Sequence, residues 1–220
     1  YAGFAGSRLK GPSTDPHFLY LADSFLHGQL ELRVPPPHGN DWATVEHLKL
    51  RSGEELTGFW WNRGQRKFMD LHRHLYVLSP GELATAKSTR TNYVSFPPLP
   101  AVLMMPGVAV WGLRFNDVLF TIVMAALNVV LAWGLLGQLR RQELTRLSPG
   151  DLLWLLVLFG FGSAHLWCSV LGQVWFTALV CGVTFTLLYV RATLADRPFW
   201  AGAALALAFA ARPPSLYGAT

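Results

Sequence analysis

Asp15 is the acidic side chain with the clearest chemical potential in the first half of the chain. It stands before Pro16 and an apolar helical pattern, and the polar His17 and Tyr20 follow within about one helical turn. A carboxylate in this place can act as a general base or bind a metal ion. Aspartate is also a preferred residue for capping a helix at its N-terminus. The local sequence alone favours the capping role.

Histidine offers a second kind of chemistry, although the seven histidines are scattered along the chain. His72 and His74 alternate and could share one face of a strand, but two nitrogens without a third ligand make a weak metal site. We expect a solvent-facing pair there. His165 lies deep in a segment without Asp, Glu, Lys or Arg. A histidine in that position either serves a function or packs with satisfied hydrogen bonds, and both interpretations stay open.

The composition excludes several classes of protein. Only 14% of the 220 residues are charged and 52% are hydrophobic, whereas disorder needs low hydrophobicity and high charge. No nucleotide-binding glycine loop, HExxH, GxSxG or CxxC motif occurs. The net charge is +5, but no basic run is interleaved with aromatics in a recognisable binding motif. We therefore expect no nucleic-acid partner.

Long uncharged apolar segments predict membrane-spanning helices in the second half of the chain. A span needs about 20 apolar residues to cross roughly 30 Å of hydrocarbon. Residues 152–190 are too many for one span and are expected to turn near Gly172. We predict spans at about residues 118–139, 152–170, 174–190 and 198–212, the last one short and ended by Pro213-Pro214. The alternative, a buried helical core in a large soluble protein, is disfavoured by the length of these segments.

The short loops predict the orientation of the spans. The basic residues of these loops are Arg140, Arg141, Arg146, Arg191 and Arg197. The positive-inside rule places loops 140–151 and 191–197 in the cytoplasm, so residues 1–117 lie outside. We expect an integral membrane protein of a bacterial inner (plasma) membrane. We also expect a fragment of a longer protein, with one upstream span and several downstream.

The outer segment is predicted to have three parts. Residues 1–40 form a loop with an amphipathic helix of about 12 residues, which begins after Asp15 and lies along the membrane surface. Residues 41–80 form a small β insertion with strands at 48–51, 55–62, 67–72 and 75–78. Trp60 and Trp61 must point to opposite faces of their strand. Residues 81–117 form a second interfacial segment, in which Pro106-Gly107 is expected to separate a pair of helices.

Several motifs in this order resemble a known superfamily. They are Asp15-Pro16 before an amphipathic helix, Phe96-Pro97-Pro98-Leu99-Pro100 opening a second interfacial segment, Arg114-Phe115-Asn116-Asp117 leading into a span, and Ala211-Arg212-Pro213-Pro214 ending a later one. The chain is similar to the multi-spanning GT-C glycosyltransferases, which include the dolichol-phosphate mannose and aminoarabinose transferases. The fold class expected is mainly α, a polytopic transmembrane helix bundle with outer juxtamembrane helices and a small β insertion.

The resemblance implies a transferase that takes a sugar from a polyprenyl-phosphate carrier at the outer membrane face, with membrane lipid around it. Asp15 takes the family's acidic position as the base, or as a ligand if a divalent metal takes part. The expected substrate-binding residues are His17, Arg114, His165, Gln173 and Arg212. Arginine suits a lipid phosphate because its guanidinium can bind phosphate through two hydrogen bonds.

Three departures from the family pattern accompany the resemblance. Phe96 stands where some members have Lys, Gln173 and His165 occupy a neighbourhood where many carry a second acid, and the β insertion is not general to the family. Two other functions are also compatible with the sequence. One is a non-catalytic integral membrane protein whose β insertion binds a partner, and the other is a transporter or channel subunit.

Overall fold

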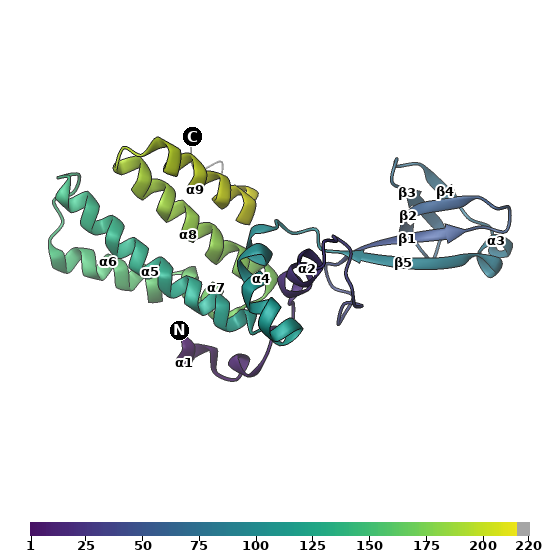
Figure 1. Cartoon of the computed structure of the whole chain (residues 1–220), viewed down its shortest axis with the longest axis horizontal. Helices are drawn as coiled ribbons and strands as arrows, with labels where there is room; N and C mark the ends of the chain where they lie inside the picture. Colours follow the sequence, from purple (N-terminus) through teal and green to yellow (C-terminus); the bar gives the residue numbers. More distant parts are fainter. Residues whose placement is uncertain (215–220) are drawn as a thin grey trace. The chain divides into compact units, whose positions relative to one another are not determined.

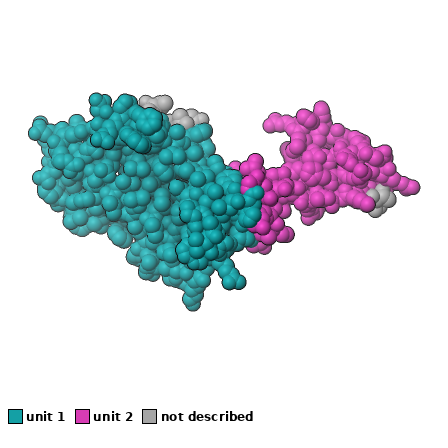
Figure 2. Space-filling view, viewed as in Figure 1, with its two compact units in different colours: residues 1–27, 96–220 teal, residues 28–95 magenta. Residues whose placement is uncertain are grey.

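The computed structural model describes residues 1–214, except for the side chains of residues 84 and 85. The chain divides into two compact units (Figure 2). The helical unit comprises residues 1–27 and the chain from residue 96 onward, and the sheet unit comprises residues 28–95. The expectation of a mainly α protein with a small β insertion is confirmed, because helices dominate and the strands form one antiparallel sheet.

The helical unit is built from short segments and longer apolar helices (Figure 1). Its elements are α1 (Ala2–Ala5), η1 (Gly6–Lys10), α2 (His17–Leu26), α4 (Leu99–Trp111), η2 (Gly112–Arg114), α5 (Asp117–Arg141), α6 (Pro149–Phe161), α7 (Ala164–Leu171), α8 (Val174–Leu194) and α9 (Pro198–Ala211).

Helix α5 shows why these segments are helical and what they face. The Asn116 side chain caps it by accepting a hydrogen bond from the Leu119 amide at 2.8 Å, and Arg140 and Arg141 lie in its last turn. One side buries aliphatic, small and polar residues, whereas the opposite side exposes Leu119, Val123, Leu127, Val130 and Trp133. A helix that is apolar all round belongs in a large core or in a membrane. The exposed apolar side is therefore compatible with contact to lipid.

Fewer helices reach membrane-spanning length than the four predicted. Among residues 1–214, α5 and α8 are long and apolar enough to cross a membrane, and α6 with α7 makes a third if that bent pair is one span. The pair bends by 44° at its break, where Gly162 ends α6 and the Ser163 side chain caps α7. Helix α9 has only 14 residues, about 21 Å at 1.5 Å per residue. The fourth predicted span, which was expected to be short, therefore does not reach spanning length.

Hydrogen bonds between helices fix their relative directions. The hydroxyls of Thr121 and Thr177 lie 2.7 Å apart near the starts of α5 and α8, and the Gln142 side chain donates to the Leu194 carbonyl at 2.7 Å near their ends. These two helices therefore run parallel and pack against each other, and the α6–α7 pair, which separates them in sequence, returns in the opposite direction. The N-termini of α5 and α8 share one end of the unit, called here the Asp15 end. The expected cytoplasmic arginines lie in the last turns of these helices or in the loops just after them, at the opposite end of the unit.

Of the two predictions for the helices before α5, one is confirmed and one was wrong. The predicted amphipathic helix is confirmed as α2, which buries Phe18, Leu19 and Leu21. The predicted break at Pro106-Gly107 was wrong, because α4 runs through it as one helix. A Cβ atom at Gly107 would come within 2.3 Å of the Phe115 ring. This glycine thus serves close packing against the chain that follows α4.

The sheet unit contains five antiparallel strands in the order β4-β3-β2-β1-β5. The strands are β1 (Ala43–Lys49), β2 (Glu55–Asn62), β3 (Lys67–Asp70), β4 (Leu75–Val77) and β5 (Lys87–Tyr93), with the short helix α3 (Pro80–Thr85) before the last one. The predicted strand at 55–62 matches β2, but β5 was not predicted. The unit therefore extends beyond the expected insertion at 41–80. Its core consists of Leu48, Leu50, Leu56, Phe68 and Leu78.

The entry and exit segments of the sheet unit pair with each other. Glu31 forms an isolated antiparallel bridge with Tyr93, and the Leu32 amide donates to the Asn92 carbonyl at 2.8 Å. The chain thus enters and leaves this unit at one place.

The strands of the sheet unit determine where the side chains of two residue pairs lie, Trp60 with Trp61 and His72 with His74. Trp60 packs edge-on against Phe68, whereas Trp61 is 63% exposed, as their alternation required. His72 and His74 lie after the end of β3 and not on a strand. His74 contacts the Asp70 carboxylate, with 3.2 Å between Nδ1 and Oδ2.

Candidate functional site

Asp15 lies at the end of an extended segment that joins η1 to α2. Its side chain is 7% exposed, and its Oδ2 accepts hydrogen bonds from the Thr14 hydroxyl at 3.0 Å and the Gln173 amide at 2.9 Å. Its backbone carbonyl accepts from the Val174 amide, in the first turn of α8, at 3.2 Å. The N-cap position of α2 is held by Pro16, so the capping role that the local sequence favoured is not the one observed.

Gly172 and Gln173 place the amide that contacts Asp15. Gly172 ends α7 in the left-handed conformation with φ 68°, which a residue without a Cβ atom adopts at little cost. A Cβ atom there would lie 2.6 Å from the Cα of Val118. The glycine therefore lets the turn between α7 and α8 approach the start of α5, and Gln173 follows as the N-cap residue of α8.

A second buried carboxylate fixes the same segment to α5. Asp117 is 2% exposed and accepts hydrogen bonds from the Ser13 amide and the Ser13 hydroxyl, each at 2.7 Å. Asp117 is the first residue of α5, and the start of a helix carries partial positive charge. The predicted cap at Asn116-Asp117 is divided between two roles: Asn116 caps α5 and Asp117 binds Ser13.

Aromatic side chains enclose the side of the site formed by α2. His17 is fully buried and meets the edge of the Phe96 ring at a centroid distance of 5.4 Å. Phe96 also contacts Phe18 and Trp175 edge-on, at 6.4 Å and 6.3 Å. The motif that opens the second interfacial segment is thus packed between α2 and the start of α8.

A cavity of about 340 Å³ lies beside the residues that hydrogen-bond to Asp15, and Asp15 itself is not among the residues that line it. Thr14 and Gln173, which both hydrogen-bond to Asp15, also line this cavity. Arg8, whose side chain is exposed, contributes a positive charge to the same walls. The remaining lining residues are Ser7, Gly11, Pro12, Ser13, Val118 and Leu171. A polar cavity of this size can hold a small sugar or a phosphate group.

The two arginines singled out from the sequence lie at the periphery of this end. Arg212 is half-buried directly after α9, and the neighbouring Ala211 packs with Leu99 of α4. Arg114 is exposed in η2, just before α5 begins. Both residues therefore belong to the Asp15 end, although neither is among the residues that line the cavity.

His165 belongs to a separate polar cluster inside the bundle. Its Nε2 lies 3.3 Å from the Asn128 amide nitrogen, and its Nδ1 lies 3.2 Å from the Tyr1 hydroxyl and 3.3 Å from the Ser169 hydroxyl. The Asn128 amide also donates to the Val180 carbonyl at 3.0 Å, and the Thr184 hydroxyl donates to Asn128 Oδ1 at 2.6 Å. These contacts are those of a packed histidine that joins α5, α7 and α8.

Metal binding would draw on few protein ligands. Within residues 1–214, no three His, Cys, Asp or Glu side chains come together in a way that could hold a metal ion. Asp15 offers one carboxylate toward a divalent cation.

The comparisons with known proteins give no further information on this site. No protein-family model, curated protein or solved structure matches the chain.

The sequence indicated part of this site and missed the rest. Asp15, His17 and Gln173 were singled out, and the structure brings Asp15 and Gln173 into contact. Arg8, Ser13 and Thr14 were not. Their only signal is a polar stretch before Asp15 that breaks at Gly11-Pro12, and such a stretch looks like an ordinary loop.

Proposed function

We propose that this chain forms part of a membrane glycosyltransferase that moves a sugar from a polyprenyl-phosphate carrier to an acceptor at the membrane surface. The observation that carries the proposal is the Asp15 carboxylate, which is buried at the shared end of α5 and α8 and is held there by Thr14 and Gln173, two residues that line a cavity of about 340 Å³. The motif order that resembles the GT-C superfamily supports the same assignment.

Asp15 has the surroundings that a general base needs. Its Oδ2 accepts hydrogen bonds from the Thr14 hydroxyl and the Gln173 amide, and these two donors orient the carboxylate. A carboxylate oriented in this way can accept the proton of an acceptor hydroxyl as that oxygen attacks the sugar. The bond between the sugar and the carrier phosphate breaks, and the new glycosidic bond forms with inversion.

Positive charge near the cavity suits the departing phosphate. Arg8 contributes to the cavity wall, and Arg114 and Arg212 belong to the same end of the helical unit. A guanidinium stabilises the negative charge that develops on a leaving phosphate. The apolar exposed sides of α5 and α6 suit a bilayer, through which a long prenyl chain would reach this end sideways.

The proposal is tested by replacing the base in the full-length protein reconstituted into proteoliposomes. The donors are polyprenyl phosphates that carry radiolabelled mannose or aminoarabinose, in membranes that contain the native acceptor lipids. Asp15→Asn is expected to lower the turnover number by about 10²- to 10⁴-fold, because the amide cannot accept the proton. The matched control is Asp23→Asn on the same helix, α2, which is expected to transfer sugar at the wild-type rate. Full activity of Asp15→Asn at wild-type protein levels contradicts the proposal.

A further inference from the structure

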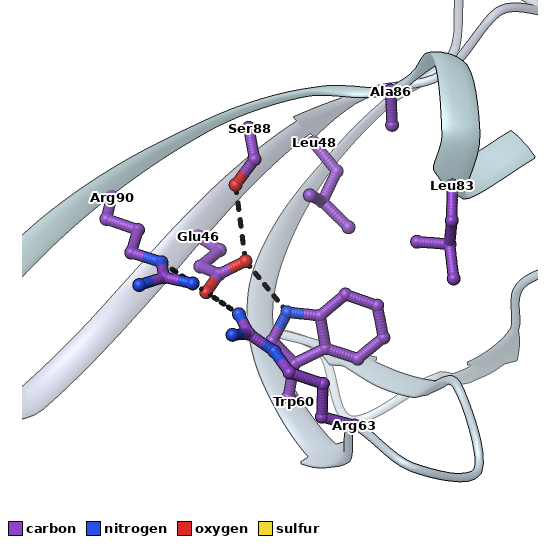
Figure 3. Close-up of a pocket in the computed structure, with 8 residues that line it drawn as sticks. All are labelled: Glu46, Leu48, Trp60, Arg63, Leu83, Ala86, Ser88 and Arg90. Carbon is purple, nitrogen blue, oxygen red and sulfur yellow. Dashed lines mark hydrogen bonds and ion pairs between the residues drawn. The ribbon is translucent and has the colours of Figure 1, made fainter.

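A second buried carboxylate cluster lies in the sheet unit, outside the site described above. Glu46 of β1 is 5% exposed, and four donors surround its carboxylate (Figure 3). Its Oε1 accepts from the guanidinium groups of Arg63 and, at 2.7 Å, Arg90. Its Oε2 accepts from the Trp60 indole at 2.7 Å and from the Ser88 hydroxyl at 3.3 Å. A carboxylate has about four lone-pair positions, so these donors saturate it.

Strand register explains how these residues meet. Glu46 is paired directly with Arg90 of β5, and Ser88 is paired with Leu48 two residues along β1. Side chains two residues apart on a strand point to the same face, so Glu46, Ser88 and Arg90 share one face. Arg63 reaches the same carboxylate from the turn after β2, and its guanidinium carbon lies 5.3 Å from the centre of the Trp60 ring.

The cluster carries more positive charge than the carboxylate needs. Burial alone would raise the pKa of Glu46, but the Trp60 hydrogen bond and the charges of Arg63 and Arg90 outweigh it and lower that pKa. With Glu46 ionised, two guanidinium groups face one negative charge, which leaves an excess of one positive charge. Each guanidinium has five N–H donors, and both side chains are 56% exposed. Most of these donors therefore remain accessible from solvent.

The same residues line a cavity of about 290 Å³. Leu48, Leu83 and Ala86 give it an apolar wall opposite the charged groups (Figure 3). A salt bridge built for stability alone would need one arginine, and such a pair is often no more stable than apolar residues in its place. Two arginines held on one carboxylate beside a hollow with an apolar wall are the features of a binding site for a small amphipathic anion.

We propose that this pocket binds a small organic monoanion, whose charged group lies between Arg63 and Arg90 and whose carbon skeleton packs against Leu48, Leu83 and the Trp60 indole. The excess of one positive charge matches a group in which two oxygens share one negative charge, as in a carboxylate or a phosphodiester. The volume suits a ligand of about the size of a monosaccharide. This inference does not depend on the proposed transferase activity.

The test uses the full chain in detergent micelles with ¹⁵N-labelled tryptophan. The Trp60 indole signal, assigned by its loss in Trp60→Phe, reports on the hydrogen bond to Glu46. Sodium glucuronate supplies a carboxylate on a sugar, glycerophosphoglycerol supplies a soluble phosphodiester, and glucose is the neutral control. At least one anion is expected to shift this signal saturably with a Kd of about 1 mM, and glucose is expected to leave it unchanged. Absence of a saturable shift with both anions overturns the proposal.

Variants separate a built site from general attraction of anions. Arg63→Gln leaves Arg90 paired with Glu46 and is expected to weaken binding by about tenfold, because one charge-assisted contact is lost. Arg66→Gln is the matched control, since it removes the same charge from the same turn but lies outside the pocket lining. Equal weakening by the two variants overturns the proposal. If Arg63→Gln changes the other indole signals and so disturbs the fold, Arg90→Lys gives the same test with the charge retained, and unweakened binding there overturns the proposal.

The origin of the anion is resolved by the same signal in nanodiscs. Nanodiscs of phosphatidylcholine alone are compared with nanodiscs that also contain phosphatidylglycerol, a monoanionic phosphodiester lipid. If the ligand is a lipid headgroup, phosphatidylglycerol shifts the Trp60 signal and weakens glucuronate binding. If the ligand is a soluble anion, only glucuronate or glycerophosphoglycerol shifts it. Either result supports anion binding in this pocket and shows whether the anion is a lipid headgroup or a soluble molecule.

Discussion

A buried carboxylate in each unit, Asp15 in the helical unit and Glu46 in the sheet unit, accepts hydrogen bonds from different kinds of donor. Asp15 in the helical unit accepts hydrogen bonds on Oδ2 from a hydroxyl and an amide. Glu46 in the sheet unit accepts from two guanidinium groups, an indole and a hydroxyl. Arginines beside a carboxylate hold it ionised. At Glu46 we therefore expect a fixed charge that organises the arginines, whereas the proposed base is Asp15, whose Oδ2 is oriented by Thr14 and Gln173.

The largest expected effect concerns the glycine that brings Gln173 to Asp15. Gly172→Ala combines a left-handed φ with a Cβ atom 2.6 Å from the backbone of Val118, so the turn between α7 and α8 must move. We expect a loss of about 3 kcal/mol in the free energy of unfolding, measured by thermal melting in detergent. Gly202→Ala in α9 is the control, because nothing lies within 4 Å of the added methyl group and alanine favours helix. A melting temperature of Gly172→Ala equal to that of the wild type would refute this account of the turn.

The next largest effect is the loss of stability in Glu46→Gln, which can be compared with the loss in Asp15→Asn. The Glu46 carboxylate accepts from four donors, and the amide in Glu46→Gln can accept from fewer. We therefore expect the local free energy of unfolding of the sheet to fall by about 2 kcal/mol. The value is moderate because both arginines are more than half exposed and solvent screens their charges. Asp15→Asn keeps an acceptor oxygen for its neutral donors and is expected to cost under about 1 kcal/mol. Amide hydrogen exchange measures both, on β1 and β5 for Glu46 and on the first turn of α8 for Asp15. Equal losses at the two sites would remove the distinction between them.

The smallest effect is a pH dependence that belongs to Glu46. Its pKa lies below the ordinary value of about 4.3 in the folded protein, so its charge stabilises the fold fully above that pH. As the pH falls through the lower folded pKa, the carboxylate becomes protonated and this contribution is lost. The difference in stability between the wild type and Glu46→Gln is therefore expected to stay constant from pH 7 to about 4.3 and to narrow below it. A difference that widens on acidification would show that the arginines do not hold the charge.

Local sequence patterns were enough to predict several helices, whereas the sites depend on contacts between residues that are far apart in the sequence. Apolar composition alone indicated α5 and α8, and helical spacing indicated α2. The strand β5 was missed because its sequence, Lys-Ser-Thr-Arg-Thr-Asn-Tyr, is polar and lacks the alternation of a half-buried strand. It is an edge strand, exposed along much of its length, so its pairing with β1 had no hydrophobic signal.

The two carboxylates show the same limit. Glu46 was not singled out from the sequence, because both of its arginines are distant in sequence and reach it only through the sheet. Asp15 was singled out from its neighbours and from a family resemblance, but its local sequence favoured a helix cap. Its contact with Gln173 depends on how α7 and α8 fold back beside the start of α5, and no local pattern encodes that approach.

The pairing of Glu31 with Tyr93, and of Leu32 with Asn92, means that the two cuts needed to excise the sheet unit lie beside each other. A few residues of linker would bridge such a gap, at an entropic cost that rises only slowly with linker length. We expect that the sheet unit can be grafted out or exchanged as a cassette while α2 and α4 keep their packing. Selection could then change what the sheet binds without rebuilding the helices beneath the proposed base.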